Sequence, residues 1–199
     1  MKQRTQTGFT LYELLTVLLI VGVVLTLGVP NMLSFRQNST MTATANDLHS
    51  AFHLARSEAS RAKSNISICA VADSTIALPV CGGELETGWV VFEDTDGDVV
   101  LDAGEPIIKR FGPVNTDIDI ATPGPDDYFI YASTGVGRQP AAGSPFAGTA
   151  ALATAILCDD RGNIRGGGGK STARVLVVTP LGRATVLAQE DQVTFHGGC

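Results

Sequence analysis

Residues 8–29 read GFTLYELLTVLLIVGVVLTLGV. From Phe9 to Val29 the chain runs for 21 residues with a single charge, that of Glu13. At about 1.5 Å of rise per residue, a helix of this length reaches about 30 Å, the thickness of the hydrocarbon core of a bilayer. The stretch therefore predicts a membrane-spanning helix.

The residues around this stretch argue against an ordinary cleaved secretory signal. Such a signal has an apolar core of about 7–15 residues with a small-residue cleavage site behind it. Here the apolar run is longer, no A-x-A follows before Pro30, and the one suitable small residue, Gly8, precedes the run. Lys2 and Arg4 lie on that same side, so the positive-inside rule keeps this end in the cytoplasm and the rest of the chain outside.

Glu13 is the unusual residue of the span, because a carboxylate among apolar residues is costly and usually has a partner. It lies five residues after Gly8. Cleavage after Gly8 would release an amine on Phe9 that can neutralise Glu13 in a packed assembly. A polar residue tolerated near the membrane surface is the alternative interpretation.

The segment GFTLYEL at residues 8–14 resembles the class III prepilin signal of type IV pilins and type II secretion pseudopilins. The resemblance implies cleavage after Gly8 by a prepilin peptidase and methylation of the new amino-terminal Phe9. It also implies that Glu13 guides the docking of subunits. Pro30 falls where these proteins carry a helix-bending proline.

Beyond Pro30 the apolar residues become periodic, with alternating spacings of 4 and 3 that place one stripe along a helix. We expect this stripe to pack on the protein's own sheet rather than in a coiled coil, since the heptads are few and rich in alanine. The stripe consists of Met41, Ala45, Leu48, Phe52, Ala55, Ala59 and Ala62.

The residues after Asn65 predict a β-rich head, because their apolar segments are short, β-branched and separated by turn residues. The predicted strands cover residues 66–71, 89–93, 106–111, 117–121, 128–132, 155–158, 173–179 and 183–188. The predicted organisation is a cleaved leader (1–8), a transmembrane and polymerisation helix (9–29), an amphipathic helix (30–64) and a periplasmic head (65–199).

Five motifs follow one another in the head: GWVVF at 88–92, DTDGD at 94–98, DAGEP at 102–106, LCDDRG at 157–162 and PLGR at 180–183. With the amino-terminal signal, they resemble the GspH/FimT family of minor pilins and pseudopilins. The implied fold is α+β, a long helix packed on two small antiparallel sheets. The implied role is that of a non-enzymatic subunit near the tip of a type II secretion pseudopilus or a type IV pilus. Its implied partners are other pilin subunits, the prepilin peptidase, the inner membrane and secreted cargo.

Four cysteines in an exported domain imply disulfides, for which three pairings exist. Cys69 and Cys81 bracket a predicted hairpin, while Cys158 and the terminal Cys199 bracket the last strands. This arrangement favours the pairing Cys69–Cys81 with Cys158–Cys199. Zinc binding is less consistent with the sequence, which has no C-x₂-C spacing.

Five acidic residues occupy positions 1, 3, 5, 9 and 12 of a twelve-residue window, which are oxygen-ligand positions of an EF-hand loop. They are Asp94, Asp96, Asp98, Asp102 and Glu105. The glycine, however, stands at position 4 instead of 6, and the flanks are predicted strands. A solvated acidic hairpin turn is the favoured interpretation, and calcium, the only cofactor considered, is the alternative.

The formal net charge of −6 argues against a generally cationic nucleic-acid binder. The charge is uneven, since residues 73–127 carry −11 and residues 128–199 carry +2. Five basic residues of the second segment form a candidate phosphate-contacting patch: Arg161, Arg165, Lys170, Arg174 and Arg183. Related proteins that act in DNA uptake bind DNA through a G-R-x-R motif, but here Thr185 replaces its second arginine. DNA uptake is therefore the alternative function.

His49 and His53 lie one helical turn apart, a spacing that allows them to share a metal ion. Ser50 stands where an H-E-x-x-H motif needs glutamate, so a solvated helix face is the favoured interpretation. The sequence contains no G-x-S-x-G nucleophile motif, and its glycine run at 166–169 lacks the first glycine of a P-loop. These observations predict that the protein is not an enzyme.

Overall fold

The computed structural model describes residues 8–124 and 127–199. Of the predicted leader, only Gly8 lies within these residues. The chain divides after Ser39 into two compact units.

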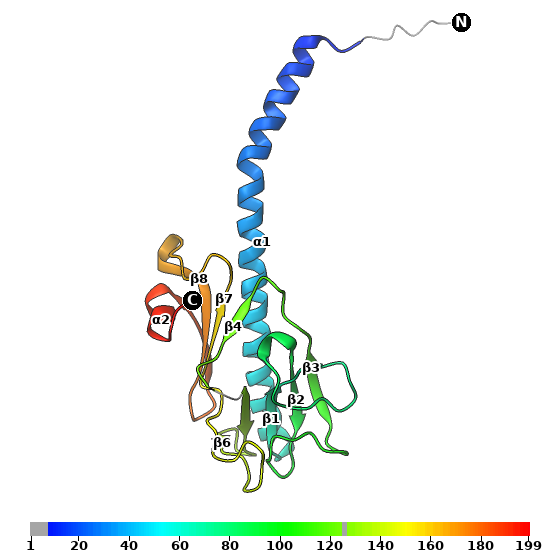
Figure 1. Cartoon of the computed structure of the whole chain (residues 1–199), viewed down its shortest axis with the longest axis vertical. Helices are drawn as coiled ribbons and strands as arrows, with labels where there is room; N and C mark the ends of the chain where they lie inside the picture. The colour runs from blue at the N-terminus through cyan, green and yellow to red at the C-terminus, as the bar shows by residue number, and fades with distance from the viewer. Residues whose placement is uncertain (1–7, 125–126) are drawn as a thin grey trace, which may run out of the picture. The chain divides into compact units, whose positions relative to one another are not determined.

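The long helix α1 (Leu11–Ala62) runs continuously from the predicted span into the head (Figure 1). By length and composition alone, it is long and apolar enough to cross a membrane. Pro30 lies within α1, and its side chain is outside the described residues. The helix ends two residues before the predicted limit at Ser64.

The head contains two antiparallel sheets (Figure 1). The first has the order β3-β2-β1-β5-β6, and the second has the order β4-β7-β8-β9. In chain order the strands are β1 (Ile66–Ala70), β2 (Trp89–Glu93), β3 (Ile107–Phe111), β4 (Asp119–Ala121), β5 (Tyr128–Tyr131), β6 (Gly137–Arg138), β7 (Thr154–Cys158), β8 (Lys170–Val178) and β9 (Ala184–Gln189). The expected fold class, a long helix on two antiparallel sheets, is confirmed.

The main core lies between the head portion of α1 and both sheets. Six of the seven stripe residues are buried there, whereas Ala62 is exposed and Ala51 joins the core instead. Phe52 is 1% exposed and meets the ring of Phe129 from β5 edge-on, with ring centroids 5.7 Å apart. The expectation that the stripe packs on the protein's own sheets is therefore correct.

Each sheet also has a smaller core on the face away from α1. Behind the first sheet, Val99, Leu101 and Phe146 from two long loops cover Val90 and Phe92 of β2. Behind the second sheet, the short helix α2 (Glu190–Phe195) buries Val193 against β7 and β8. The alternation of side chains along a strand thus fills both faces of each sheet.

Several elements of the head differ from the sequence prediction. The strand β6 and the helix α2 were not predicted, and neither were the 3₁₀ turns η1 (Leu85–Thr87) and η2 (Gly167–Gly169). The segment 141–153, predicted as a loop of small residues, contains the core residues Phe146 and Leu152. At its end the segment pairs with both sheets, since the Leu152 amide donates to the Tyr128 carbonyl and the Ala153 carbonyl accepts the Val178 amide, each at 2.8 Å.

Asp94 organises the loop that connects β2 to β3. It is fully buried, and its Oδ1 accepts hydrogen bonds from the amides of Gly97 (2.7 Å) and Asp98 (3.0 Å). Its Oδ2 accepts the Val99 amide at 3.0 Å and the Ser67 hydroxyl. Val99, a β-branched residue, has a φ of 65°. Such a residue rarely adopts this conformation, so the hydrogen bonds to Asp94 and the burial of its side chain must stabilise it.

Each of the two disulfides cross-links a strand to a residue outside the strands. Cys69 of β1 pairs with Cys81, and Cys158 of β7 pairs with the terminal Cys199. The second bond closes a sequence separation of 41 residues and ties the end of the chain to the second sheet. Chain termini are poorly ordered unless such a link holds them.

We predict that Phe52→Ala lowers the free energy of unfolding by about 3–5 kcal/mol, because it removes a buried ring and leaves a cavity between α1 and the first sheet. Urea unfolding followed by circular dichroism measures this change. The matched control is Phe195→Ala, whose ring is 81% exposed, and which should change stability by less than about 0.5 kcal/mol. Equal effects of the two substitutions would contradict the assignment of the core.

We predict that Asp94→Asn lowers the free energy of unfolding by about 1–3 kcal/mol, because an amide can offer only one acceptor oxygen to the buried amides of the loop. Asp96→Asn is the control, since Asp96 is exposed on the same loop. The same urea unfolding assay applies. A stability unchanged by Asp94→Asn, or lowered equally by Asp96→Asn, would show that Asp94 does not hold this loop.

Candidate functional site

The amino-terminal end of α1 is closed by a reciprocal pair of hydrogen bonds between Thr10 and Glu13. The Thr10 amide donates to Glu13 Oε2 at 2.9 Å, and the Glu13 amide donates to Thr10 Oγ1 at 3.2 Å. The Thr10 hydroxyl also donates to Glu13 Oε2 at 2.9 Å. This is a capping box, in which residues three apart satisfy free amides at the start of a helix. Its sequence signal is T-x-x-E at residues 10–13, which gives Glu13 a role in capping the helix besides its charge.

The first unit exposes almost all of its large apolar side chains. Phe9 is 85% exposed, Leu11 77% and Leu19 69%. Contiguous apolar surface of this size marks a membrane or protein contact. Within this unit, every large apolar residue from Leu11 to Val29 is at least 45% exposed.

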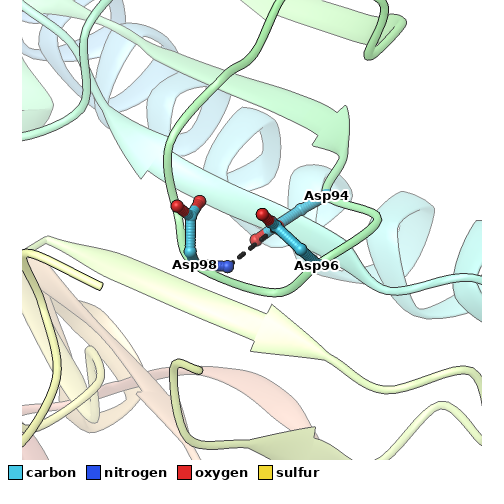
Figure 2. A group of neighbouring side chains, drawn as sticks. All are labelled: Asp94, Asp96 and Asp98. Atoms are coloured by element: carbon cyan, nitrogen blue, oxygen red, sulfur yellow. Dashed lines mark hydrogen bonds between the residues drawn. The ribbon is translucent and has the colours of Figure 1, made fainter. Parts of the chain in front are cut away.

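The acidic loop brings three carboxylates together (Figure 2). Asp94, Asp96 and Asp98 each present an oxygen within 4.8 Å of the others. The dashed line in Figure 2 joins the Asp94 carboxylate to the amide of Asp98. Partial burial raises the pKa of Asp98 above its usual range. The negative charges of Asp96, Asp94 and Asp102 raise it further.

Of the two remaining acidic residues of the window, Glu105 binds the loop backbone through its carboxylate. Glu105 accepts the Thr95 amide at 2.7 Å and the Asp102 amide at 3.1 Å. Burial, more than any neighbouring charge, raises the pKa of Glu105. These carboxylates therefore stabilise a tight acidic turn through amides of the chain itself. The solvated acidic turn stays the favoured interpretation of this loop, and calcium binding stays the alternative.

Of the five basic residues in the candidate patch, Arg183 lies apart from Lys170. Lys170 begins β8, whereas Arg183 stands in the turn beyond the end of that nine-residue strand. Lys170 pairs with Gln189 of β9, which lies six residues beyond Arg183, so at about 3.3 Å per residue the two basic residues are about 20 Å apart. Arg183 instead lines a small cavity with His53, Arg56 and Tyr131.

The basic residues near Lys170 are largely engaged by other groups. The Arg161 guanidinium binds the Asp159 carboxylate, with N–O distances between 2.6 and 3.1 Å. Arg174 donates to the carbonyls of Ser171 (2.7 Å) and Ala173 (2.8 Å), and burial lowers its pKa. Arg165 lies 3.6 Å from Glu190, in a groove that Asp191 also lines. Carboxylates therefore lie against Arg161 and Arg165, and DNA binding stays a prediction.

His49 and His53 point their rings at each other from the exposed side of α1. Their Nε2 atoms lie 3.1 Å apart, and their ring centroids lie 4.4 Å apart. Burial lowers the pKa of His53, and the charges of His49 and Arg56 add to this effect. The sequence spacing indicated that the two rings are neighbours, but it could not indicate that the same nitrogen of each faces the other.

Two crystal structures of the type IV minor pilin FimU from Pseudomonas aeruginosa (strain PAO1) are similar at 16% sequence identity. The first has a TM-score of 0.48 and covers 77% of this chain and 92% of FimU; the second has a TM-score of 0.45 and covers 73% and 91%. No curated protein matches the chain.

The model of the family described as type II transport protein GspH matches residues 44–182. This match covers most of the head, includes four of its five motifs in full, and ends at Gly182 within the fifth. It confirms the family that these motifs indicated. The chain belongs to the GspH family.

Proposed function

We propose that this protein is a structural, non-enzymatic minor pilin or pseudopilin subunit. It is inserted in the inner membrane by residues 9–29, with its head in the periplasm. A prepilin peptidase cuts it after Gly8 and methylates Phe9. The subunit then leaves the membrane and joins a filament through the same apolar helix.

The observation that carries this proposal is the contrast between the two portions of α1. Between Met41 and Ala59 the apolar stripe is fully covered by the head. From Leu11 to Val29 the helix is apolar all round and exposed. A helix that is apolar all round is stable only inside a membrane or a protein core. In a filament, neighbouring copies of such helices replace the lipid chains.

The position of Glu13 gives a second argument for the same proposal. Its carboxylate already accepts the Thr10 amide, one residue from the Phe9 nitrogen that cleavage after Gly8 would free. The carboxylate is thus held at the end of the helix where a neighbouring amine has to arrive. Pairing with the Phe9 amine of the preceding subunit would neutralise both charges in an apolar filament core and set the register between subunits.

The family description, type II transport protein, favours a type II secretion pseudopilus over a type IV pilus. In a pseudopilus a minor subunit would prime assembly near the tip or contact exported cargo. The separation of Lys170 from Arg183 weakens the alternative, DNA uptake through a basic edge. The genes adjacent to this one would distinguish the two filament systems.

We predict that Glu13→Gln and Glu13→Ala both leave cleavage after Gly8 intact but reduce incorporation into filaments at least tenfold. Glutamine preserves the acceptor for the Thr10 amide but removes the charge, so it separates pairing with an amine from helix capping. Quantitative immunoblots of sheared filaments against whole cells measure incorporation. Gel mobility of the same samples reports cleavage.

Thr10→Ala is the matched control, because it removes the hydroxyl half of the capping box and keeps the Glu13 charge. It should be incorporated nearly as well as the wild type. If Glu13→Gln is incorporated normally while Thr10→Ala is not, Glu13 acts as a helix cap and its role in register is wrong. Normal incorporation of Glu13→Ala would contradict both roles.

A further inference from the structure

The His49–His53 pair has the geometry of a two-point metal chelate. The two Nε2 atoms lie 3.1 Å apart on one face of α1. Imidazole nitrogens bind transition metals at about 2.0–2.1 Å. For an ion about 2.05 Å from each nitrogen, the N–metal–N angle would therefore be about 98°. This angle lies between the octahedral and the tetrahedral value, so the pair can bind an ion with little movement.

The rest of the environment distinguishes this pair from the acidic loop. Among the described residues, no carboxylate is hydrogen-bonded to either imidazole, so the candidate metal ligands are the two ring nitrogens. Imidazole favours copper, nickel and zinc over calcium or magnesium. Both residues lie on a regular stretch of α1, with Leu48 and Phe52 buried beside them, so the backbone that carries the rings is fixed.

We propose that His49 and His53 together bind one divalent transition-metal ion through their Nε2 atoms, with Cu²⁺ the preferred ion. Water fills the remaining coordination positions, which face solvent because His53 is exposed. In the metal-free protein one Nε2 carries the proton of the hydrogen bond between the rings. On metal binding that proton moves to Nδ1 of the same ring, so that both Nε2 lone pairs are available and no proton need be released.

Two further features bear on this site. The two rings lie edge to face, with an interplanar angle of 65° and centroids 4.4 Å apart, so the pair is compact. Arg56 and Arg183 line the cavity beside His53, and their charges oppose a dication. The site therefore suits an ion that binds strongly to nitrogen, which in the series of divalent metals is Cu²⁺ before Ni²⁺ or Zn²⁺.

The absence of a third protein ligand in the sequence argued only against a closed zinc site. A two-point chelate needs no third side chain, and the distance between the nitrogens is the new observation that supports it. The proposal does not depend on the role of the protein in a filament.

The test is a titration of the full chain in detergent with CuSO₄, followed by isothermal calorimetry and by electron paramagnetic resonance. We expect one ion per chain and nitrogen hyperfine splitting from two imidazoles. His49→Ala and His53→Ala should each weaken binding at least tenfold, and each should reduce the splitting to that of one nitrogen. Both positions are solvent-facing, and thermal unfolding of the metal-free variants verifies that they fold.

His196→Ala is the control, because His196 lies after α2 and contacts Phe195 instead of another imidazole. It should bind Cu²⁺ as the wild type does. The proposal is overturned if the wild type binds no tighter than the single variants at positions 49 and 53. It is also overturned if His196→Ala loses as much affinity as they do, or if the spectrum shows one nitrogen in the wild type.

Discussion

Burial of one face of α1 between Met41 and Ala59 is the interaction on which the head depends. Residues of β1, β2 and β5 from the first sheet and of β7 and β8 from the second meet this face in one core. Four of the helix residues in this core are alanines, which permit close approach of the sheets. Neither sheet could keep its inner face dry without the helix, since each has too few strands to enclose a core of its own.

The apolar outer faces of the two sheets must also be covered, and segments outside the sheets cover them. The loop after β2 covers the first sheet with Val99 and Leu101, and the Asp94 carboxylate fixes the turn that delivers them. The helix α2 covers the second sheet, and the Cys158–Cys199 disulfide holds the chain end just beyond it. The acidic sequence that resembles a calcium loop is therefore also a structural part of the head.

The sequence predicted the elements whose signals are local and strong. The stripe on α1 follows from its spacing of 4 and 3 residues, and all eight predicted strands are present because their β-branched residues alternate between two faces. The helix α2 was missed because six residues are too few for a helical period to be recognised. The strand β6 was missed because its two residues, Gly137 and Arg138, carry no strand propensity and pair only through their place beside β5.

The candidate site was predictable in its residues but not in its contacts. The motif around Gly8 and Glu13 is legible in the sequence, whereas the separation of Lys170 from Arg183 depends on the length of β8. Likewise, the approach of His49 Nε2 to His53 Nε2 depends on side-chain rotation, which residue spacing does not determine. Distances between residues far apart in the sequence, and the rotation of side chains, could be learned only from the structure.

The helix α1 has a segment that is buried in the head and an exposed apolar segment that needs other molecules to cover it. The intact mass of this subunit, recovered from filaments sheared from cells, tests that claim most directly. The account predicts a chain of residues 9–199 with both disulfides and one added methyl group, present in the filament fraction. A filament subunit that retains residues 1–8, or a processed subunit that never enters the filament fraction, would contradict it.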